Sequence, residues 1–216
     1  QSYFLHAVRP EVLPRVLFPL GELRKPDVRM RANELGLRNY ARKDSTGICF
    51  IGERDFKAFL KRYIPAQPGD IVTPNGVYLG KHDGLMYYTL GQRQGLGIGG
   101  KKGFEGAVWY VADKDLHNNI LIVVNGHQHP LLYSKALTAI DLHWVAGEAP
   151  AMPYQCSAKT RYRQQDAACT ITQLAGDRCH VAFSEAQWAV TPGQSVVFYQ
   201  GDVCLGGGII NEFERV

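Results

Sequence analysis

The sequence lacks the features that mark several specialised classes of protein. No apolar run approaches the roughly 20 residues that a membrane helix requires, so we expect no membrane contact. Basic and acidic residues nearly balance, 24 against 20, and a net charge of only +4 excludes a general polyanion binder. The five cysteines are an odd number without CxxC spacing, which favours neither a disulfide framework nor a zinc site. This cysteine usage fits a reducing compartment, and we expect a cytoplasmic protein.

The beginning of the chain shows no pattern of a secretory signal. It carries Arg9, Glu11 and two prolines where a signal peptide would have an unbroken apolar stretch. The sequence also begins at Gln1, without an initiator methionine and within what looks like ordered sequence. We therefore expect that it is a piece of a longer protein.

Helical apolar spacing is confined to the N-terminal part of the chain. Val28, Ala32 and Leu35 recur at i, i+4 and i+7 behind Pro26, and the pattern ends at Gly36, a residue typical of helix ends. Two shorter helices are also expected, one containing Val12, Val16 and Leu17 and the other containing Phe56, Phe59, Leu60 and Tyr63.

The rest of the chain is predicted to be mostly β, because β-branched and aromatic clusters alternate with glycine-containing turn signals. One hairpin turns at Asn75-Gly76, and two strands join near Asn118-Asn119. From Ala136 onward, six short strands follow at nearly regular spacing, as in a small antiparallel barrel. We therefore expect a mainly β fold in three parts: an α-helical N-terminal end-piece (1–60), a small β-rich middle domain (61–133) and a C-terminal antiparallel β-barrel (134–216).

The glycine cluster GLGIGGKKG matches two phosphate-binding patterns. Gly95, Gly97 and Gly100 satisfy GxGxxG, and the stretch from Gly95 to Lys101 satisfies GxxxxGK. However, Lys102 stands where a Walker loop needs Ser or Thr, and a strand follows where both motifs need a helix. We therefore expect either a lysine-bearing loop near RNA or a tight turn.

Most of the other residues that could take part in catalysis or metal binding are expected to have structural roles. His127 and His129 lack a third ligand at metal spacing and lie beside Pro130, which favours a polar loop. Four cysteines lie in alternating strand patterns and are expected to be small core residues: Cys156, Cys169, Cys179 and Cys204.

Cys49 is the exception among the cysteines. Its surroundings, ARKDSTGICFIGERDF, are typical of a loop between helices, and the basic residues Arg42, Lys43, Arg54 and Lys57 are close in sequence. Cationic neighbours lower the pKa of a thiol and favour the nucleophilic thiolate. Cys49 is thus a candidate nucleophile, although no local His or Asp completes a protease-type triad.

Five separate stretches carry a resemblance to one known family. They are KDSTGICFIGERDF, YTLGQRQGLGIGG, KTRYR, TPGQSVVFY and CLGGGII. In this order they closely resemble the bacterial tRNA 2-thiouridylases, which put sulfur on position 2 of the wobble uridine of Lys, Glu and Gln tRNAs. The family's SGGxDS loop for ATP and its first catalytic cysteine do not occur in these residues. The resemblance therefore implies the C-terminal portion of such an enzyme.

The resemblance also implies a chemistry for Cys49. Cys49 matches the family's persulfide-carrying cysteine, which accepts sulfur from a relay protein. ATP with Mg²⁺, bound by the missing N-terminal domain, adenylates the C2 oxygen of uridine 34, and the persulfide then attacks C2. A second cysteine, absent here, releases the sulfur as the two close into a disulfide. For these 216 residues alone we expect a monomer without activity and without a metal or organic cofactor of its own.

Four positions match tRNA contacts of the family: Gln1, Arg161, Tyr162 and Gln194. This mixture is physically reasonable, because Arg supplies charge to phosphate, Tyr offers a stacking face and Gln bonds to sugar or base edges. From the residues alone, an ordinary solvated strand face is the alternative for Lys159, Arg161 and Arg163.

Two functional hypotheses remain. In the first, the residues belong to an ATP-dependent tRNA sulfurtransferase, and the intact STGICFIGER motif favours it. In the second, the chain is a non-catalytic RNA-binding module, for which the missing ATP loop is the only argument. A methyltransferase, an older label for this family, is disfavoured because no convincing S-adenosylmethionine site is found.

Overall fold

A computed structural model describes residues 2–42, 59, 62–99 and 106–216 of the protein. The chain divides into two compact units: Gln1–Pro10 together with Ala66–Val216, and Glu11–Pro65. Strands predominate, which confirms the mainly β fold class. The expected boundaries after residues 60 and 133 stay predictions. No helix in the described part of the chain has the length and apolar character that crossing a membrane demands.

The described part of the Glu11–Pro65 unit includes the α-helix α2 (Lys25–Glu34). Pro26 lies in its first turn, where its missing N–H costs nothing, and Gly36 follows its end with a φ of 66°. This confirms the predicted helix.

The expected helix around Val12, Val16 and Leu17 is wrong. Only a 3-10 turn forms there, η1 (Leu13–Arg15), and Val16 is already extended. Pro19 favours this outcome, because a proline disfavours helical backbone in the residue before it. The third expected helix lies mostly outside the described residues.

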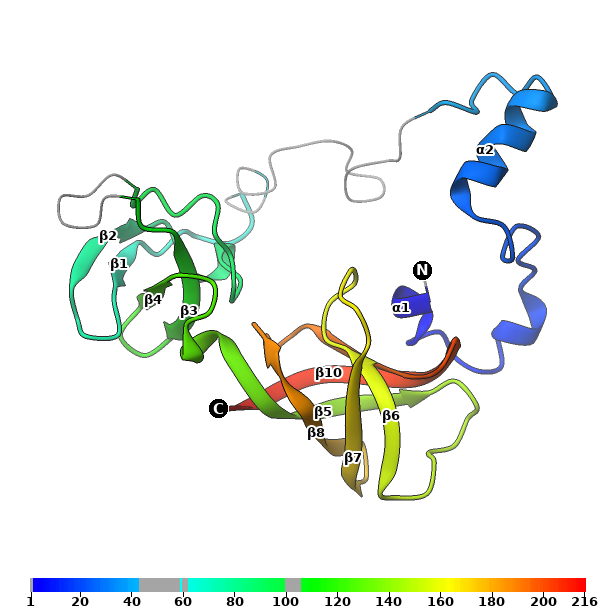
Figure 1. Ribbon diagram of the computed structural model, residues 1–216. Helices are drawn as coiled ribbons and strands as arrows, with labels where there is room; N and C mark the ends of the chain where they lie inside the picture. The colour runs from blue at the N-terminus through cyan, green and yellow to red at the C-terminus, as the bar shows by residue number, and fades with distance from the viewer. Residues whose placement is uncertain (1, 43–58, 60–61, 100–105) are drawn as a thin grey trace. The chain divides into compact units, whose positions relative to one another are not determined.

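Four strands form the smaller sheet, in the order β2-β1-β4-β3 (Figure 1). Both predicted hairpins are present, with Gly76 and Asn119 at positive φ in their turns. One face packs on a cluster that includes the fully buried Ile71, Val111 and Leu121. The bounds are β1 (Gly69–Val72), β2 (Tyr78–His82), β3 (Trp109–Asp115) and β4 (Ile120–Asn125), with a 3-10 turn η2 (Leu85–Tyr87) between β2 and β3.

Six antiparallel strands close into a barrel, in the order β10-β5-β8-β7-β6-β9 (Figure 1). This confirms the predicted C-terminal barrel. Its interior is filled by apolar side chains, with Phe198, Leu137 and Ile171 fully buried. The bounds are β5 (Tyr133–Trp144), β6 (Tyr154–Lys159), β7 (Ala167–Ala175), β8 (Arg178–Trp188), β9 (Ser195–Gln200) and β10 (Val203–Arg215), with the 3-10 turn η3 (Pro130–Leu132) before β5.

Arg215, at the end of β10, joins the barrel to the smaller sheet. Its guanidinium donates to the carbonyl oxygen of Leu131 at 2.7 Å, to that of Ala112 at 3.1 Å and to a carboxylate oxygen of Asp113 at 2.6 Å. The planar fork of arginine suits such multiple acceptors. The last residue of the last strand thus anchors β3.

The N-terminal segment, which begins with α1 (Ser2–Leu5), lies on the outer wall of the barrel. Side chains alternate along β9, so that Val197 and Tyr199 face outward and pack with Tyr3. The Tyr3 hydroxyl donates to the carbonyl oxygen of Ser195 at 2.9 Å, and His143 Nε2 donates to that of Val8 at 2.8 Å. These contacts fix the N-terminal segment, which is distant in sequence, beside β9.

Gly206 in β10 provides a test of the barrel's close strand packing. It has a φ of 146°, and a Cβ there would collide with the backbone carbonyl of His143. We expect Gly206→Ala to lower the free energy of unfolding by roughly 3 kcal/mol, from strain and overpacking together. The matched control is Gly99→Ala, whose Cβ meets nothing within 4 Å. Urea unfolding followed by circular dichroism should show the control within about 0.5 kcal/mol of the parent, and equal losses in both variants would contradict the packing argument.

Candidate nucleic-acid interface

Three segments that are far apart in the sequence meet on one side of the barrel. The ring of Phe4, from α1, lies 4.5 Å from the ring of Tyr162, between their centroids. Arg161, beside it, donates to Thr191 Oγ1 at 3.3 Å, in the turn that carries Gln194. With the Tyr3 to Ser195 bond described above, these contacts bring the N-terminal segment, residues 160–166 and the turn before β9 together.

Residues 160–163 form a turn after the end of β6, so the alternative of a solvated strand face is wrong for Arg161 and Arg163. The turn is held by Gln164, whose Oε1 accepts bonds from the backbone N–H of Thr160 at 3.2 Å and from its hydroxyl at 2.8 Å. Gln164 Nε2 in turn donates to Gln187 Oε1 on β8 at 2.8 Å. Alternation alone does not reveal such a side-chain cap, which ends the strand at Lys159.

An aromatic patch, defined as Phe4, Tyr162 and Arg163, is exposed at this site. Phe4 is 64% exposed and Tyr162 41%. The Arg163 guanidinium lies 5.9 Å from the centre of the Tyr162 ring, within the range of a cation–π contact. Exposed rings with an adjacent guanidinium suit a ligand that has flat bases and negative phosphates.

Arg161 differs from Arg163, because it is partly buried and committed to groups within the protein. Its Nη2 donates to the carbonyl oxygens of Leu90 and Ala189, and its guanidinium lies 5.4 Å from the Trp188 ring. Burial lowers the pKa of Arg161, and the Tyr3 hydroxyl partly offsets this effect. Arg161 therefore ties the 160–166 turn to the loop before β3 and to the end of β8.

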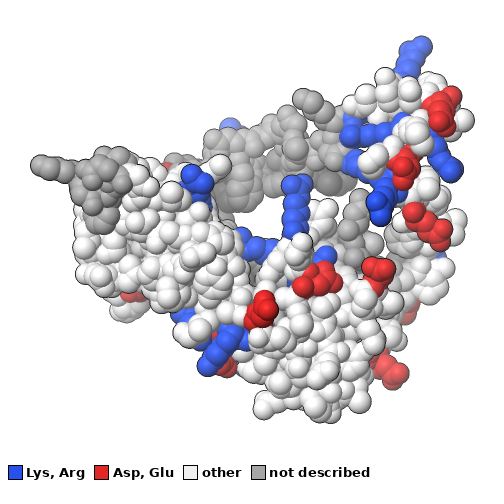
Figure 2. Space-filling view, in the orientation of Figure 1, with Lys and Arg blue, Asp and Glu red and all other residues white. Residues whose placement is uncertain are grey.

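Little charge surrounds the aromatic patch. Lys159 forms an ion pair with Asp166 at 3.0 Å and lies over the Tyr199 ring, so its charge is partly neutralised. In Figure 2 most of the barrel surface in view carries neither basic nor acidic side chains. This agrees with a net charge of +4 and with a local rather than a general RNA-binding surface.

Comparisons with known proteins match the whole chain. Three domain models follow one another along it: the tRNA methyl transferase HUP domain over residues 1–53, the tRNA methyl transferase PRC-barrel domain over 57–125 and the aminomethyltransferase β-barrel domain over 134–210. Relatives named tRNA-specific 2-thiouridylase MnmA include those of Marinobacter nauticus, 61% identical over 215 residues, and Methylococcus capsulatus, 62% identical over 213 residues. The chain belongs to the tRNA 2-thiouridylase family.

The similarity covers nearly all of this chain but only part of each relative. It extends over 100% and 98% of this chain but over only 55% and 57% of those two relatives. The tRNA-specific 2-thiouridylase MnmA of Vibrio cholerae gives the same picture, with 61% identity and shares of 98% and 57%. The chain thus spans a little over half the length of the curated relatives it matches.

Of the residues expected to contact tRNA, the structure brings Arg161, Tyr162 and Gln194 into one region. Gln194 is exposed in its turn, where its backbone N–H donates to the Thr191 carbonyl oxygen at 3.2 Å. Gln1 lies outside the described residues, two positions before the anchored Tyr3. Cys49 also lies outside them, and its role stays a prediction.

Phe4 is the residue of this surface that sequence reasoning missed. Its contact with Tyr162 joins positions that are far apart in the sequence, which no local pattern encodes. The one available signal was its place three residues after Gln1, in a segment that the family resemblance had already marked.

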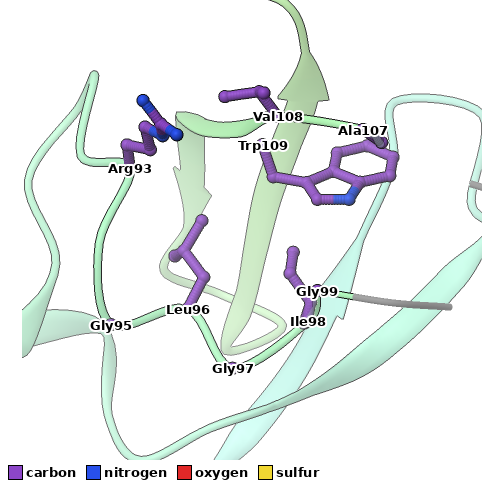
Figure 3. Close-up of a pocket in the computed structure, with 9 residues that line it drawn as sticks. All are labelled: Arg93, Gly95, Leu96, Gly97, Ile98, Gly99, Ala107, Val108 and Trp109. Carbon is purple, nitrogen blue, oxygen red and sulfur yellow. The ribbon is translucent and has the colours of Figure 1, made fainter. Parts of the chain in front are cut away.

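The glycine-rich loop forms a cavity of about 190 Å³, lined by residues that include Arg93 and Gly97 (Figure 3). Pockets for small molecules usually measure about 300–1,000 Å³. The buried side chains of Leu96 and Ile98 belong to the core of the small sheet together with Trp109. These features favour the tight turn; contact of the loop with RNA stays a prediction, since its lysines lie outside the described residues.

The two expected loop histidines contact nearby parts of the fold. The His127 ring stacks on Trp188 with 4.6 Å between centroids, and Trp188 Nε1 donates to the His127 carbonyl oxygen at 3.1 Å. His129 Nδ1 accepts from the backbone N–H of Leu131 at 3.2 Å and so caps η3. Both residues thus help to hold the join between β4 and β5.

Stability measurements can separate the two arginines of the turn. Arg161→Ala removes the Arg161 donor from the carbonyl oxygens of Leu90 and Ala189, of which Ala189 keeps the Thr191 hydroxyl, so we expect a loss of about 2–4 kcal/mol in the free energy of unfolding. Arg161→Lys keeps the positive charge without the planar fork of the guanidinium, and its free energy of unfolding should fall by less. The matched control is Arg163→Ala, an exposed position that should change stability by less than about 0.5 kcal/mol. Chemical unfolding of the three variants tests this, and equal effects of Arg161→Ala and Arg163→Ala would show that Arg161 makes no structural tie.

Proposed function

We propose that this chain is the tRNA-docking and persulfide-carrying part of an enzyme that transfers sulfur to C2 of the wobble uridine, position 34, of Lys, Glu and Gln tRNAs. Membership of the family supports the reaction. The observation that carries the docking role is the meeting of Phe4, Tyr162 and the Gln194 turn on one side of the barrel.

The aromatic patch is proposed to hold an unpaired nucleotide of the tRNA. The exposed faces of Tyr162 and Phe4 offer stacking surfaces, and single-stranded bases are the parts of an RNA that aromatic side chains contact best. Arg163 adds a cation for the adjoining phosphate, and Gln194 and Gln1 supply hydrogen bonds to sugar or base edges. Arg161 has one terminal nitrogen, Nη1, to offer to the RNA, because only its Nη2 bonds to described residues.

Sulfur transfer is assigned to Cys49. In this proposal a relay protein loads the Cys49 thiolate with a second sulfur atom, and the basic neighbours in sequence keep the resulting persulfide ionised. The uridine arrives with its O2 already adenylated at the expense of ATP, in a domain outside this chain. The terminal persulfide sulfur then forms a bond to C2, and the C2–O2 bond breaks with loss of AMP. A second cysteine outside this chain releases the sulfur from Cys49 by forming a disulfide with it.

Residues 1–216 alone are therefore proposed to bind tRNA and to accept sulfur without completing the reaction. The glycine-rich loop carries Lys102 where a Walker loop needs Ser or Thr to hold the magnesium ion. The cellular compartment is proposed to be the cytoplasm, where tRNA and a reducing environment for Cys49 coincide.

Binding measurements with the full-length enzyme test the docking role. Tyr162→Ala should weaken tRNA binding by roughly 1–3 kcal/mol, the usual value of one stacked base, whereas Tyr162→Phe keeps the ring and should bind almost normally. Arg163→Ala should flatten the log–log dependence of affinity on salt by about one unit. None of these changes should alter persulfide loading of Cys49. If all three variants bind tRNA with the parent affinity and salt dependence, the RNA surface lies elsewhere.

Single-turnover assays of the full-length enzyme test the role of Cys49. Cys49→Ser removes the persulfide carrier, so 2-thiouridine formation should fall to background while adenylation of the tRNA continues. The control is Cys204→Ser, which removes a partly exposed thiol from β10 and should leave both steps unchanged. Thiolation near the parent rate by Cys49→Ser would reject the assignment and favour a non-catalytic RNA-binding role for this chain.

A further inference from the structure

Cys156 and Cys169 face each other across the β6–β7 hairpin, whose turn carries Tyr162 and Arg163 of the aromatic patch. They are direct partners in the antiparallel pairing of β6 with β7. Their sulfur atoms lie 3.6 Å apart. Opposed residues in antiparallel strands have Cα atoms about 4.5–5.5 Å apart, within the range of about 4.4–6.8 Å found in disulfides. A covalent bond between the sulfurs therefore requires rotation of the side chains and no movement of the strands.

The two thiols have different surroundings. Cys169 is buried in the barrel core, whereas Cys156 is partly exposed. Their hydrogen bond stabilises a thiolate at Cys156, lowering its pKa, while the same bond and burial raise the pKa of Cys169. Cys156 is thus suited to attack a reagent from solvent, and Cys169 is placed to attack only its neighbour.

The other described cysteines lack this arrangement. Cys179 is buried on β8, and burial raises the pKa of its thiol to about 12. Cys204 lies on β10 and packs with the Tyr3 cluster on the outer wall. Among the described residues, the sulfur pair is therefore particular to Cys156 and Cys169.

We propose that Cys156 and Cys169 form a reversible dithiol–disulfide site that reacts with low-molecular-weight disulfides. The Cys156 thiolate attacks one sulfur of the small disulfide, forms a mixed disulfide and expels one thiolate. The Cys169 thiol then loses its proton, attacks the Cys156 sulfur and expels the second thiolate. The two cysteines together lose two electrons, and the small disulfide gains them as two thiols. An excess of small thiol reverses both steps.

The disulfide between Cys156 and Cys169 links β6 to β7, the two strands on either side of the 160–166 turn. The chain between the cysteines runs from the end of β6 through Tyr162 and Arg163 to the start of β7. The proposal uses neither Cys49 nor its chemistry, so its test is independent of the proposed sulfur transfer.

Peptide mapping of the full-length protein tests the proposal. The protein is equilibrated with a series of ratios of reduced to oxidised glutathione, the free thiols are alkylated in acid-quenched samples, and trypsin is applied without reductant. Trypsin cuts after Lys159, Arg161, Arg163 and Arg178, so Cys156, Cys169 and Cys179 fall on separate peptides. We expect a linked pair of the Cys156 and Cys169 peptides, lighter than their sum by two hydrogen atoms, that disappears again at high reduced glutathione.

Three variants make the mapping decisive. Cys156→Ser and Cys169→Ser should each lose the linked pair, and Cys169→Ser should accumulate glutathione on Cys156. Cys204→Ser should behave like the parent. A link from Cys169 to Cys179, or glutathione that stays on Cys156 in the parent protein, would overturn the proposal. The proposal is also overturned if both thiols stay reduced at every ratio of reduced to oxidised glutathione.

Discussion

The hydrogen bonds of one guanidinium group, that of Arg161, hold together the parts from which the candidate interface is built. Carbonyl and hydroxyl oxygens replace water at Nη2 of this partly buried guanidinium, whereas its buried Nε has no hydrogen-bond partner among the described residues. Leu90 supplies one of these oxygens from the loop before β3, and Ala189 and Thr191 supply two from the connection between β8 and β9. The loop of the smaller sheet, the end of β8 and the turn before β9 are thereby tied to the residue that directly precedes Tyr162. The direction in which Tyr162 faces solvent depends on this tie.

The turn separates residues that a strand would have kept on the same face. In a continued β6, Arg161 and Arg163 would share one side, because side chains alternate with a period of two. In the turn, Arg161 is directed to internal carbonyl oxygens, and Arg163 lies over the Tyr162 ring. Two arginines separated by a single residue thus have different surroundings, one at internal carbonyl oxygens and the other at the surface.

Periodicity predicted the fold better than the site. The two hairpins, α2 and the six barrel strands follow from local patterns, because apolar alternation and glycine turns act over a few neighbouring residues. The end of β6 was missed, since it depends on the amide of Gln164 rather than on alternation. Tyr162 and Gln194 were marked only by family resemblance, and Phe4 was not marked at all. Its place depends on the packing of Tyr3 against β9, a contact between opposite ends of the chain.

In the proposed docking role, the composition of the interface would let a nearly neutral chain select one class of RNA. Charge alone attracts every RNA, because phosphates are the same in all of them. Here Lys159 is paired with Asp166 and Arg161 with carbonyl oxygens, which leaves Arg163 as the exposed cation of the aromatic patch. Stacking on Phe4 and Tyr162 requires a base that is already out of the helix, as in a tRNA loop. If the patch binds RNA as proposed, recognition depends on the shape of the RNA more than on its charge, and a small net charge favours that selectivity.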